Sequence, residues 1–470
     1  MDDRAFSIEA VGRELPDGLA VVTSAATFTF GALAQRARRL ASHLAGEARA
    51  QRPVGLVPTL RSETFVAIYA LMELGVPIVL VHPRLTARER EVLVASAGVS
   101  VVLDECWSDE NLPDPALVPP APRVHDPEST MALLFTSGSS GVPKGVVLSR
   151  RAFAAAAAAS AANVGWQADD RWLLCMPVAH VGGLSVIVRC LAARVPVVLS
   201  PWTGAADALL GEIARHRATL LSLVPTMLAR ILEDAPGRPF PPHVRAVFLG
   251  GDAAHGSLLR AAVERGVPVL TTYGLTEACS QVATQAYGEP PSLDGAIGRP
   301  LHGVEVRIVN GEVQVRGPTL MTGYFPADRF PSPFLAGGWL PTGDQGALDD
   351  DGRLRIRGRR SDLIITGGEN VDPAEVEQVL VTCGGVRDAC VFGIADDRWG
   401  QIVAAAIVAQ NGSDAVSLEA LAHHVRTTLA SHKQPRVVAI VEALILNATG
   451  KLDRRATAAM VASALVPLPR

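Results

Sequence analysis

Residues 134–148 read LFTSGSSGVPKGVVL, and the interpretation of the whole chain starts from this stretch. An apolar strand enters a loop of glycines and small hydroxyl residues, a lysine follows, and a second apolar strand leaves. Glycines and serines let backbone N–H groups and hydroxyls turn toward an anion, and a lysine adds positive charge for outer phosphates. The stretch therefore predicts a loop that binds a polyphosphate.

The loop differs from the phosphate loop of P-loop NTPases. Lys144 follows Pro143 instead of a glycine and precedes Gly145 instead of Ser or Thr. A P-loop NTPase is therefore excluded as the simple interpretation. The structural alternative is a Ser/Gly turn between two strands with no ligand.

Composition describes a large chain that folds and that lacks a strong charge bias. The 470 residues are 49% hydrophobic and 19% charged, and the formal net charge is −4. At ~150 residues per domain, at least two lobes are expected. No basic field is present to favour nucleic acid or an anionic membrane.

The N-terminus lacks the pattern of a signal peptide and no apolar run is long enough to cross a bilayer, so we predict a cytoplasmic protein.

Apolar runs that alternate with helical patterns predict an α/β fold of layered, mostly parallel sheets covered by helices. The near-continuous alanines of 152–162 predict a helix packed closely on its neighbours. The expected strands lie at 54–57, 77–81, 99–103, 195–199, 220–224, 246–250 and 267–274.

The character of the chain changes twice toward its C-terminus. From about Ala296, short alternating strands predict a small β-rich part, in which DDDG at 349–352 is expected to form a hairpin turn and not a calcium loop. After Arg359 a separate helix and strand alternation begins. We therefore predict a large N-terminal lobe over 1–358 and a small, mobile α/β lobe over 359–470. The six scattered cysteines argue against a disulfide framework or a structural zinc.

The string TSGSSGVPKG at 136–145 resembles the signature loop of the acyl-adenylate-forming superfamily, which includes acyl- and aryl-CoA synthetases, adenylation domains and luciferases. The resemblance implies an AMP-forming acid–thiol ligase that uses ATP, Mg²⁺ and coenzyme A, with two lobes. It also implies ATP binding by the loop residues Thr136, Ser137, Gly138, Ser139, Ser140, Gly141 and Lys144.

Further motifs of that family follow in order. In YGLTE at 273–277, the resemblance places Tyr273 and Gly274 at the nucleotide, Thr276 at the α-phosphate and Glu277 on Mg²⁺. A carboxylate is a suitable hard ligand for that ion.

LGGDAA at 249–254 occupies the place of the adenine-binding turn and implies ATP contacts from Gly251 and Asp252. It departs from the family pattern at Asp252 and Ala253. This departure concerns the expected contacts between the turn and the adenine base.

GWLPTGDQG at 338–346 resembles the ribose motif, with Asp344 accepting hydrogen bonds from the sugar hydroxyls. Arg359 matches the arginine that also reaches the ribose, at the hinge between lobes. Ser361 stands where the family usually has Asp or Lys, which bears on the kinetics of the hinge.

Two motifs belong to the C-terminal lobe. NATGKLDR at 447–454 implies that Lys451 enters the cleft during adenylation and stabilises growing negative charge. GGEN at 367–370 implies that Gly367, Gly368 and Glu369 line the path of the thiol arm of CoA.

The acyl pocket is implied to contain His180, Gly250, Ser280 and Gln281, with His180 also a catalytic candidate. His180 has the alternative of an ordinary core histidine. The loop at 176–185 lacks the acidic residue that holds an α-amino group in amino-acid-activating members. The pocket segments most resemble the branch that activates 2-succinylbenzoate for menaquinone biosynthesis.

Other functions remain open at this point. A benzoate- or anthranilate-type acid is an alternative substrate. An acyltransferase that loads a carrier protein and a non-catalytic nucleotide sensor are alternative functions on the same scaffold. The expected partners are a small carboxylic acid and CoA, with a carrier protein and a homo-oligomer as further possibilities.

Overall fold

The structure is a computed structural model that describes residues 3–46, 52–108, 112, 125–136, 144–235, 237–254, 256–359, 362–366, 369–410, 416–447 and 452–469. The chain divides into two compact units, Met1–Glu305 with Val315–Leu340 and Val306–Gln314 with Pro341–Arg470. The second unit thus includes strands that precede Arg359. The boundary expected at 358/359 concerns a point of rotation, and it stays a prediction.

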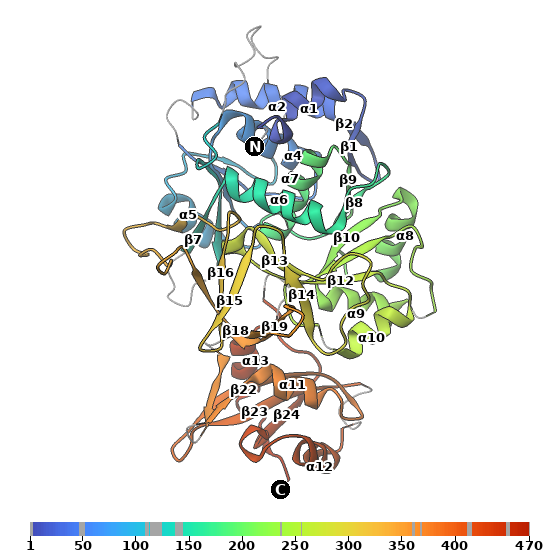
Figure 1. The fold of residues 1–470 in the computed structure, drawn as a ribbon, viewed down its shortest axis with the longest axis vertical. Helices are drawn as coiled ribbons and strands as arrows, with labels where there is room; N and C mark the ends of the chain where they lie inside the picture. The colour runs from blue at the N-terminus through green and yellow to red at the C-terminus, as the bar shows by residue number, and fades with distance from the viewer. Residues whose placement is uncertain are drawn as a thin grey trace. The chain divides into compact units, whose positions relative to one another are not determined.

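The larger sheet of the first unit is parallel over most of its width, as the sequence predicts (Figure 1). Its strand order is β14-β13-β12-β11-β10-β8-β9-β1-β2. Neighbours from β12 through β10, β8 and β9 to β1 are parallel, whereas β2, β13 and β14 pair antiparallel. The strands are β1 (Leu19–Val22), β2 (Thr27–Thr29), β8 (Trp172–Leu174), β9 (Val197–Leu199), β10 (Leu220–Leu223), β11 (Ala246–Leu249), β12 (Val269–Leu275), β13 (Ser280–Thr284) and β14 (Ala296–Pro300).

The second sheet of this unit carries the two strands that flank the predicted phosphate loop. Its order is β17-β7-β6-β4-β3-β5, and only β17 and β7 break the parallel arrangement. The strands are β3 (Val54–Leu56), β4 (Ile78–Leu80), β5 (Val101–Leu103), β6 (Thr130–Thr136), β7 (Lys144–Ser149) and β17 (Gly323–Phe325). The loop between β6 and β7 therefore starts at the carboxyl end of a parallel strand, where ligands bind in such sheets.

The alanine-rich segment forms α6 (Arg150–Val164), as predicted. The Ser149 hydroxyl accepts a hydrogen bond from Ala152 N at 3.2 Å and caps its start, and Gly165 ends it at φ 63°. The helix contacts β7 of one sheet, β13 of the other and the helix α7. Small side chains permit these close approaches. The other helices of this unit are α1 (Ile8–Glu14), α2 (Phe30–His43), α4 (Ser62–Leu74), α5 (Ala87–Ser96), α7 (Val181–Ala193), α8 (Ala206–His216), α9 (Pro225–Asp234) and α10 (Gly256–Glu264).

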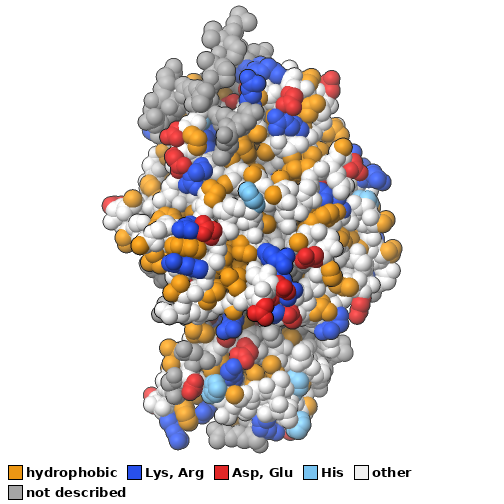
Figure 2. Space-filling model, viewed as in Figure 1, with side chains coloured by type: hydrophobic (Ala, Val, Ile, Leu, Met, Phe, Trp, Pro, Cys, Tyr) orange, Lys and Arg blue, Asp and Glu red, His pale blue; other side chains and the backbone are white. Residues whose placement is uncertain are grey.

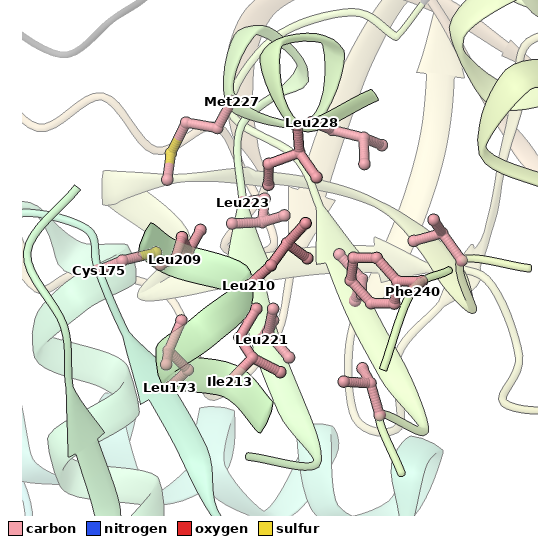
Figure 3. Close-up of a cluster of buried hydrophobic side chains, with 14 of the residues drawn as sticks. Leu173, Cys175, Leu209, Leu210, Ile213, Leu221, Leu223, Met227, Leu228 and Phe240 are labelled. Atoms are coloured by element: carbon pink, nitrogen blue, oxygen red, sulfur yellow. The ribbon is translucent and has the colours of Figure 1, made fainter. Parts of the chain in front are cut away.

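A buried apolar cluster fixes the larger sheet to the helices on one of its faces (Figure 3). The α8 side chains Leu209, Leu210 and Ile213 face the sheet, and each is at most 2% exposed. Leu221 and Leu223 of β10 lie opposite them, and Met227, Leu228 and Phe240 close the cluster. At about 1.5–3 kcal/mol for each fully buried large side chain, such clusters are the main stabilising contribution to this layer.

The second unit combines a four-strand run with a smaller α/β part. β15 (Glu305–Val309), β16 (Glu312–Arg316), β18 (Leu340–Leu348) and β19 (Leu354–Arg359) are neighbours in that order. The DDDG segment forms the turn between β18 and β19, where the Asp349 carboxylate accepts from the backbone of Asp351 and Arg353 at 3.1 and 2.8 Å. The hairpin prediction is confirmed.

The C-terminal part has the helix and strand alternation expected from the sequence. The strand order is β21-β20-β23-β24-β25, and β22 pairs with β23. The elements are β20 (Ile364–Thr366), β21 (Glu369–Val371), α11 (Pro373–Leu380), β22 (Val386–Asp396), β23 (Gly400–Ala409), α12 (Leu418–Thr428), β24 (Val437–Val441), α13 (Arg454–Val461) and β25 (Val466–Pro467).

The surface charge and the hydrophobicity of the helices are as the composition predicts. On the face shown in Figure 2, positive and negative side chains are interspersed. In the described part of the chain, no helix is long and apolar enough to cross a membrane.

A buried ion pair joins the segment before β8 to the segment before β11. Arg245 binds Asp170 through Nε and Nη2, at 2.7 and 2.5 Å, and the Thr219 hydroxyl donates to the same carboxylate at 2.8 Å. Burial alone would raise the pKa of Asp170, but the hydrogen bonds from Arg245, Gln167 and Thr219 outweigh it and lower that pKa.

We predict that Arg245→Met lowers the free energy of unfolding by about 3–5 kcal/mol, because it leaves a carboxylate buried without its cation. Thermal melts of the two proteins at neutral pH measure the difference. Since the folded-state pKa of Asp170 is lowered, the difference should shrink as the pH falls through that pKa. Arg230→Met, at an exposed pair with Asp234, is the matched control and should cost at most about 1 kcal/mol. Equal effects of the two changes would contradict the prediction.

Candidate active site

A close approach between β12 and β13 organises the predicted nucleotide site. Gly274 pairs with Gln281, and Leu275 pairs with Ser280. A Cβ atom at position 274 would lie 1.8 Å from the carbonyl oxygen of Ser280, so only glycine fits there. The pairing places Tyr273 and Gly274 at the end of β12, directly before Thr276 and Glu277.

The turn between these strands is short and partly left-handed. Thr276–Ala278 forms a single 3₁₀ turn, η2, closed by a 3.1 Å hydrogen bond from Cys279 N to Thr276 O. Cys279 has φ 53° and Ser280 has φ 96°, a conformation that non-glycine residues rarely adopt. Such backbone strain concentrates at functional sites. Thr276, Glu277, Ser280 and Gln281 thus lie within six residues of one tight turn.

Two of the residues predicted for the acyl pocket, Gly250 and Gln281, lie close to Thr272. A Cβ atom at Gly250 would lie 2.6 Å from Thr272 Cγ2, so β11 and β12 also approach closely here. Gln281, 6% exposed, donates from Nε2 to the hydroxyls of Thr284 and Thr272 at 3.1 and 3.4 Å. Its Oε1 is buried without a hydrogen-bond partner among the described residues. That these residues contact the acid stays a prediction.

Glu277 and Lys144 meet around a residue that the sequence did not single out. Tyr324 donates a hydrogen bond from Oη to Glu277 Oε1 at 3.0 Å, and Lys144 Nζ lies 3.4 Å from the centroid of its ring. Burial, the charge of Glu277 and this hydrogen bond all raise the pKa of Tyr324, so its hydroxyl stays a donor. GYF at 323–325 has no feature in the sequence that distinguishes it from other short strands.

His180 caps the start of α7 and stacks on His82. The two rings are 5.0 Å apart between centroids and tilted by 40°. Burial lowers the pKa of His82, and the charges of Arg84 and Arg90 lower it further. A neutral His82 therefore lies beside His180 at physiological pH. The sequence placed His180 in the pocket without anticipating this histidine pair.

Arg189 on α7 is the second residue that the sequence analysis missed. It is 5% exposed, and its Nε and Nη2 are buried without a hydrogen-bond partner in the part of the chain that the structure describes. The titratable groups that interact with it are the Cys279 and Cys190 thiols, whose pKa values burial raises so far that both are uncharged at neutral pH. Its guanidinium carbon is 5.9 Å from the centroid of the Trp172 ring. Burial lowers the pKa of Arg189 to about 10, so it is still charged at neutral pH.

The sequence did contain a sign of Arg189, since it is the only charge in the apolar run LSVIVRCLAA at 184–193. A buried cation that lacks an anion is costly. Because Cys279 directly precedes Ser280 and Gln281, this cation lies next to the predicted acyl pocket.

The turn predicted to bind adenine is exposed at residues 251–253. Gly251 has φ 90°, and exposed Asp252 accepts a hydrogen bond from Ala253 N at 2.8 Å. The Asp252 carboxylate thus stabilises the turn in which it lies. This is the position at which the sequence departs from the family pattern.

In the second unit, the structure brings the two predicted ribose residues together. Asp344 on β18 and Arg359 on β19 are directly paired, and Asp344 is 6% exposed. The Thr342 hydroxyl accepts from Asp344 N at 3.1 Å and orders the turn before it. Glu369 is exposed at the start of β21 and pairs with Thr366 of β20.

Several predicted residues lie outside the described part of the chain. These are Ser137, Gly138, Ser139, Ser140, Gly141, Gly367, Gly368 and Lys451, together with the side chains of Thr136 and Arg359. Their roles stay predictions.

The residues around Glu277 suit a magnesium ion that is bound together with a nucleotide. In the described residues, no group of three or more His, Cys, Asp or Glu side chains forms a metal cage. Glu277 is a single carboxylate in a polar turn, which fits an ion that is held mainly by phosphate oxygens and water.

The comparisons with known proteins agree with this geometry. The sequence profile of the AMP-binding enzyme family matches residues 8–325, and that of the AMP-binding enzyme C-terminal domain matches residues 375–451. A 2-succinylbenzoate–CoA ligase of Bacillus cereus is 35% identical over 94% of this chain and 95% of its own.

Two solved structures of o-succinylbenzoate CoA synthetase from Bacillus subtilis are similar over the whole fold. One is in complex with the acyl-adenylate intermediate OSB-AMP; it has a TM-score of 0.85 at 32% identity and covers 95% of this chain and 96% of that one. The other contains ATP and a magnesium ion; it has a TM-score of 0.84 at 32% identity and covers 96% and 98%.

The fold and the site thus define an adenylate-forming enzyme, with a large α/β domain and a small C-terminal domain. The chain belongs to the AMP-binding enzyme family, and the resemblance inferred from the sequence is confirmed.

We predict that Gly274→Ala lowers the rate of adenylation at least tenfold, because the added methyl group would force β12 and β13 apart at the turn that carries Thr276 and Glu277. Acid-dependent exchange of pyrophosphate into ATP measures this rate. Gly211→Ala is the control, since a Cβ at that position of α8 meets nothing within 4 Å. That variant should keep the rate and gain about 0.5–1 kcal/mol of stability. Wild-type exchange by Gly274→Ala would contradict the prediction.

Proposed function

We propose that this protein joins 2-succinylbenzoate to coenzyme A with ATP, releasing AMP and pyrophosphate, in the cytoplasm. The curated relative and the Bacillus subtilis structures carry this activity in their names. The chain spans nearly the full length of these relatives. ATP, Mg²⁺ and CoA are accordingly its expected substrates.

Buried Arg189 is the observation that selects the acid. 2-Succinylbenzoate has one carboxylate on its ring and a second at the end of its succinyl chain. Adenylation converts one into an uncharged acyl group, and the other stays negative within the pocket. The guanidinium of Arg189, whose Nε and Nη2 are buried without a hydrogen-bond partner among the described residues, supplies the matching charge. Benzoate and anthranilate have one carboxylate and would leave Arg189 unpaired.

In the first step, a carboxylate oxygen attacks the α-phosphorus of ATP and pyrophosphate leaves. Thr276 hydrogen-bonds the α-phosphate, Lys144 and the loop before it bind the outer phosphates, and Glu277 contributes a ligand to the magnesium ion that ATP brings. Asp344 and Arg359 hold the ribose. Lys451 adds positive charge where negative charge grows in the transition state.

In the second step, the thiol sulfur of CoA attacks the acyl carbon, AMP leaves and the thiol proton is released. We propose that residues 359–362 are the hinge between the lobe over 1–358 and the lobe over 359–470. Rotation there exchanges Lys451 for the Gly367–Glu369 turn at the site. The family profiles match on either side of this hinge, with residues 326–374 between them.

A screen of acids against both half-reactions tests the proposal. Pyrophosphate exchange and CoA-thioester formation are measured with 2-succinylbenzoate, benzoate, anthranilate and a medium-chain fatty acid. We expect both reactions with 2-succinylbenzoate and little of either with the others. Exchange without transfer to CoA would favour a carrier protein as acceptor, and no exchange with any aryl acid would refute the proposal.

We predict that Arg189→Met lowers kcat/KM for 2-succinylbenzoate by a factor equivalent to about 2–5 kcal/mol, because the second carboxylate loses its partner. Activity toward benzoate should stay equal or rise. The melting temperature should hold or increase, since a buried charge is replaced by an apolar side chain of similar volume. Arg245→Met, which loses a structural ion pair, should show the opposite pattern of lower stability with unchanged acid preference. Equal losses with both acids in Arg189→Met would contradict the assignment.

We predict that Lys451→Ala slows adenylation by orders of magnitude and leaves transfer to CoA from a supplied acyl-adenylate largely intact. The physical reason is that the ammonium stabilises charge in the first transition state only. Single-turnover assays of each half-reaction measure the two rates. Equal loss in both would refute this role.

A further inference from the structure

We propose that Tyr324 is a positioning residue that keeps Lys144 and Glu277 apart and directs each toward the magnesium–triphosphate group of ATP. The inference rests on the proposed function for the nature of that ligand. Its structural basis is one tyrosine with a hydrogen bond to the acid on its hydroxyl and the ammonium on its ring face.

The backbone fixes Tyr324 between the two charged residues. Tyr324 lies on β17 directly opposite Val146 of β7, and Lys144 is two residues before Val146. Residues two apart on a strand share a face, so Lys144 and Tyr324 are diagonal neighbours on one side of the sheet. The measured 3.4 Å from Nζ to the ring centroid agrees with this register.

The same segment is tied to the turn that carries Glu277. Met321 N donates to the carbonyl oxygen of Glu277 at 2.8 Å, and Thr322 N donates to Val147 O at 2.9 Å. Residues 321–325 therefore connect the strand that begins at Lys144 to the η2 turn through the main chain. These backbone hydrogen bonds fix the main chain of Tyr324 between β7 and the η2 turn, whatever contacts its side chain makes.

The two contacts use different parts of the tyrosine. The hydroxyl hydrogen binds one oxygen of Glu277 and leaves the other oxygen and further lone pairs for a metal ion. The negative face of the ring attracts the ammonium of Lys144, and Phe330 adds a second ring 5.7 Å from Nζ. A ring–ammonium contact attracts more weakly than a direct ion pair, so phosphate oxygens can displace it.

Lys144 and Glu277 both contact Tyr324, so without the ring their opposite charges would attract each other. A direct Lys144–Glu277 pair would occupy the carboxylate that binds magnesium and the cation that binds phosphate. Both groups would then have to separate before ATP binds. Tyr324 prevents this pairing because it lies between the two residues: its hydroxyl binds Glu277 and its ring binds Lys144.

The test measures MgATP binding without the acid, by calorimetry over a range of Mg²⁺ concentrations, in Tyr324→Phe and Tyr324→Leu. Tyr324→Phe keeps the ring and loses the hydroxyl, so we expect the Mg²⁺ requirement to rise about tenfold at most, as for one hydrogen bond to a charged group. Tyr324→Leu loses both, so the Mg²⁺ requirement and the Kd for ATP should both rise, by about tenfold more than in Tyr324→Phe.

The double variant Tyr324→Leu with Lys144→Met distinguishes this proposal from a general distortion of the ATP site by the loss of the tyrosine. If Lys144 captures Glu277 in Tyr324→Leu, removal of the lysine returns the Mg²⁺ requirement toward the wild-type value, although ATP itself still binds weakly. No such return, or identical effects of Phe and Leu at position 324, would overturn the proposal.

Tyr287→Leu is the matched control. Tyr287 makes a cation–π contact with Arg245 at 5.2 Å, away from the site, and its loss should leave MgATP binding unchanged. Melting temperatures of all variants identify any that fail to fold. Because binding is measured without the acid, a failure of the 2-succinylbenzoate assignment would leave this test of Tyr324 intact.

Discussion

The contact between β12 and β13 at Gly274 determines the geometry of the candidate site. With 1.8 Å between a hypothetical Cβ and the Ser280 carbonyl, the two strands approach as closely as backbone allows. The chain must then reverse through the left-handed residues Cys279 and Ser280. This reversal sets Thr276 and Glu277 on one side of the turn and Gln281 on the other. The residues proposed for the phosphates and for the acid thus belong to one rigid element.

Charges in the first unit follow two different arrangements. Asp170 and Arg245 satisfy each other and join parts of the scaffold. Among the described residues, Arg189 Nε and Nη2 are buried without a hydrogen-bond partner, and Lys144 and Glu277 contact the ring and the hydroxyl of Tyr324. Charged groups in such environments concentrate at functional sites.

The proposed roles divide between the two compact units. The first holds the residues for phosphate, magnesium and the acid, and the second holds those for ribose and the thiol. Asp344 and Arg359 are paired across β18 and β19, so the residues proposed for the ribose lie on one strand pair, and the proposed hinge starts at Arg359.

The sequence alone determined the α/β class, the order of the strands along the chain, and the motifs around Lys144, Glu277 and Asp344, because each depends on local periodicity or on a contiguous string of residues. Only the tertiary structure revealed the roles proposed for Tyr324 and Arg189. Tyr324 gains its role because β17 lies beside β7. The sequence marks Arg189 as a lone charge in an apolar run, but only the packing shows that its Nε and Nη2 are buried without a hydrogen-bond partner among the described residues. Pairing between distant strands and the absence of a counter-charge are properties of three-dimensional packing, which local sequence patterns do not encode.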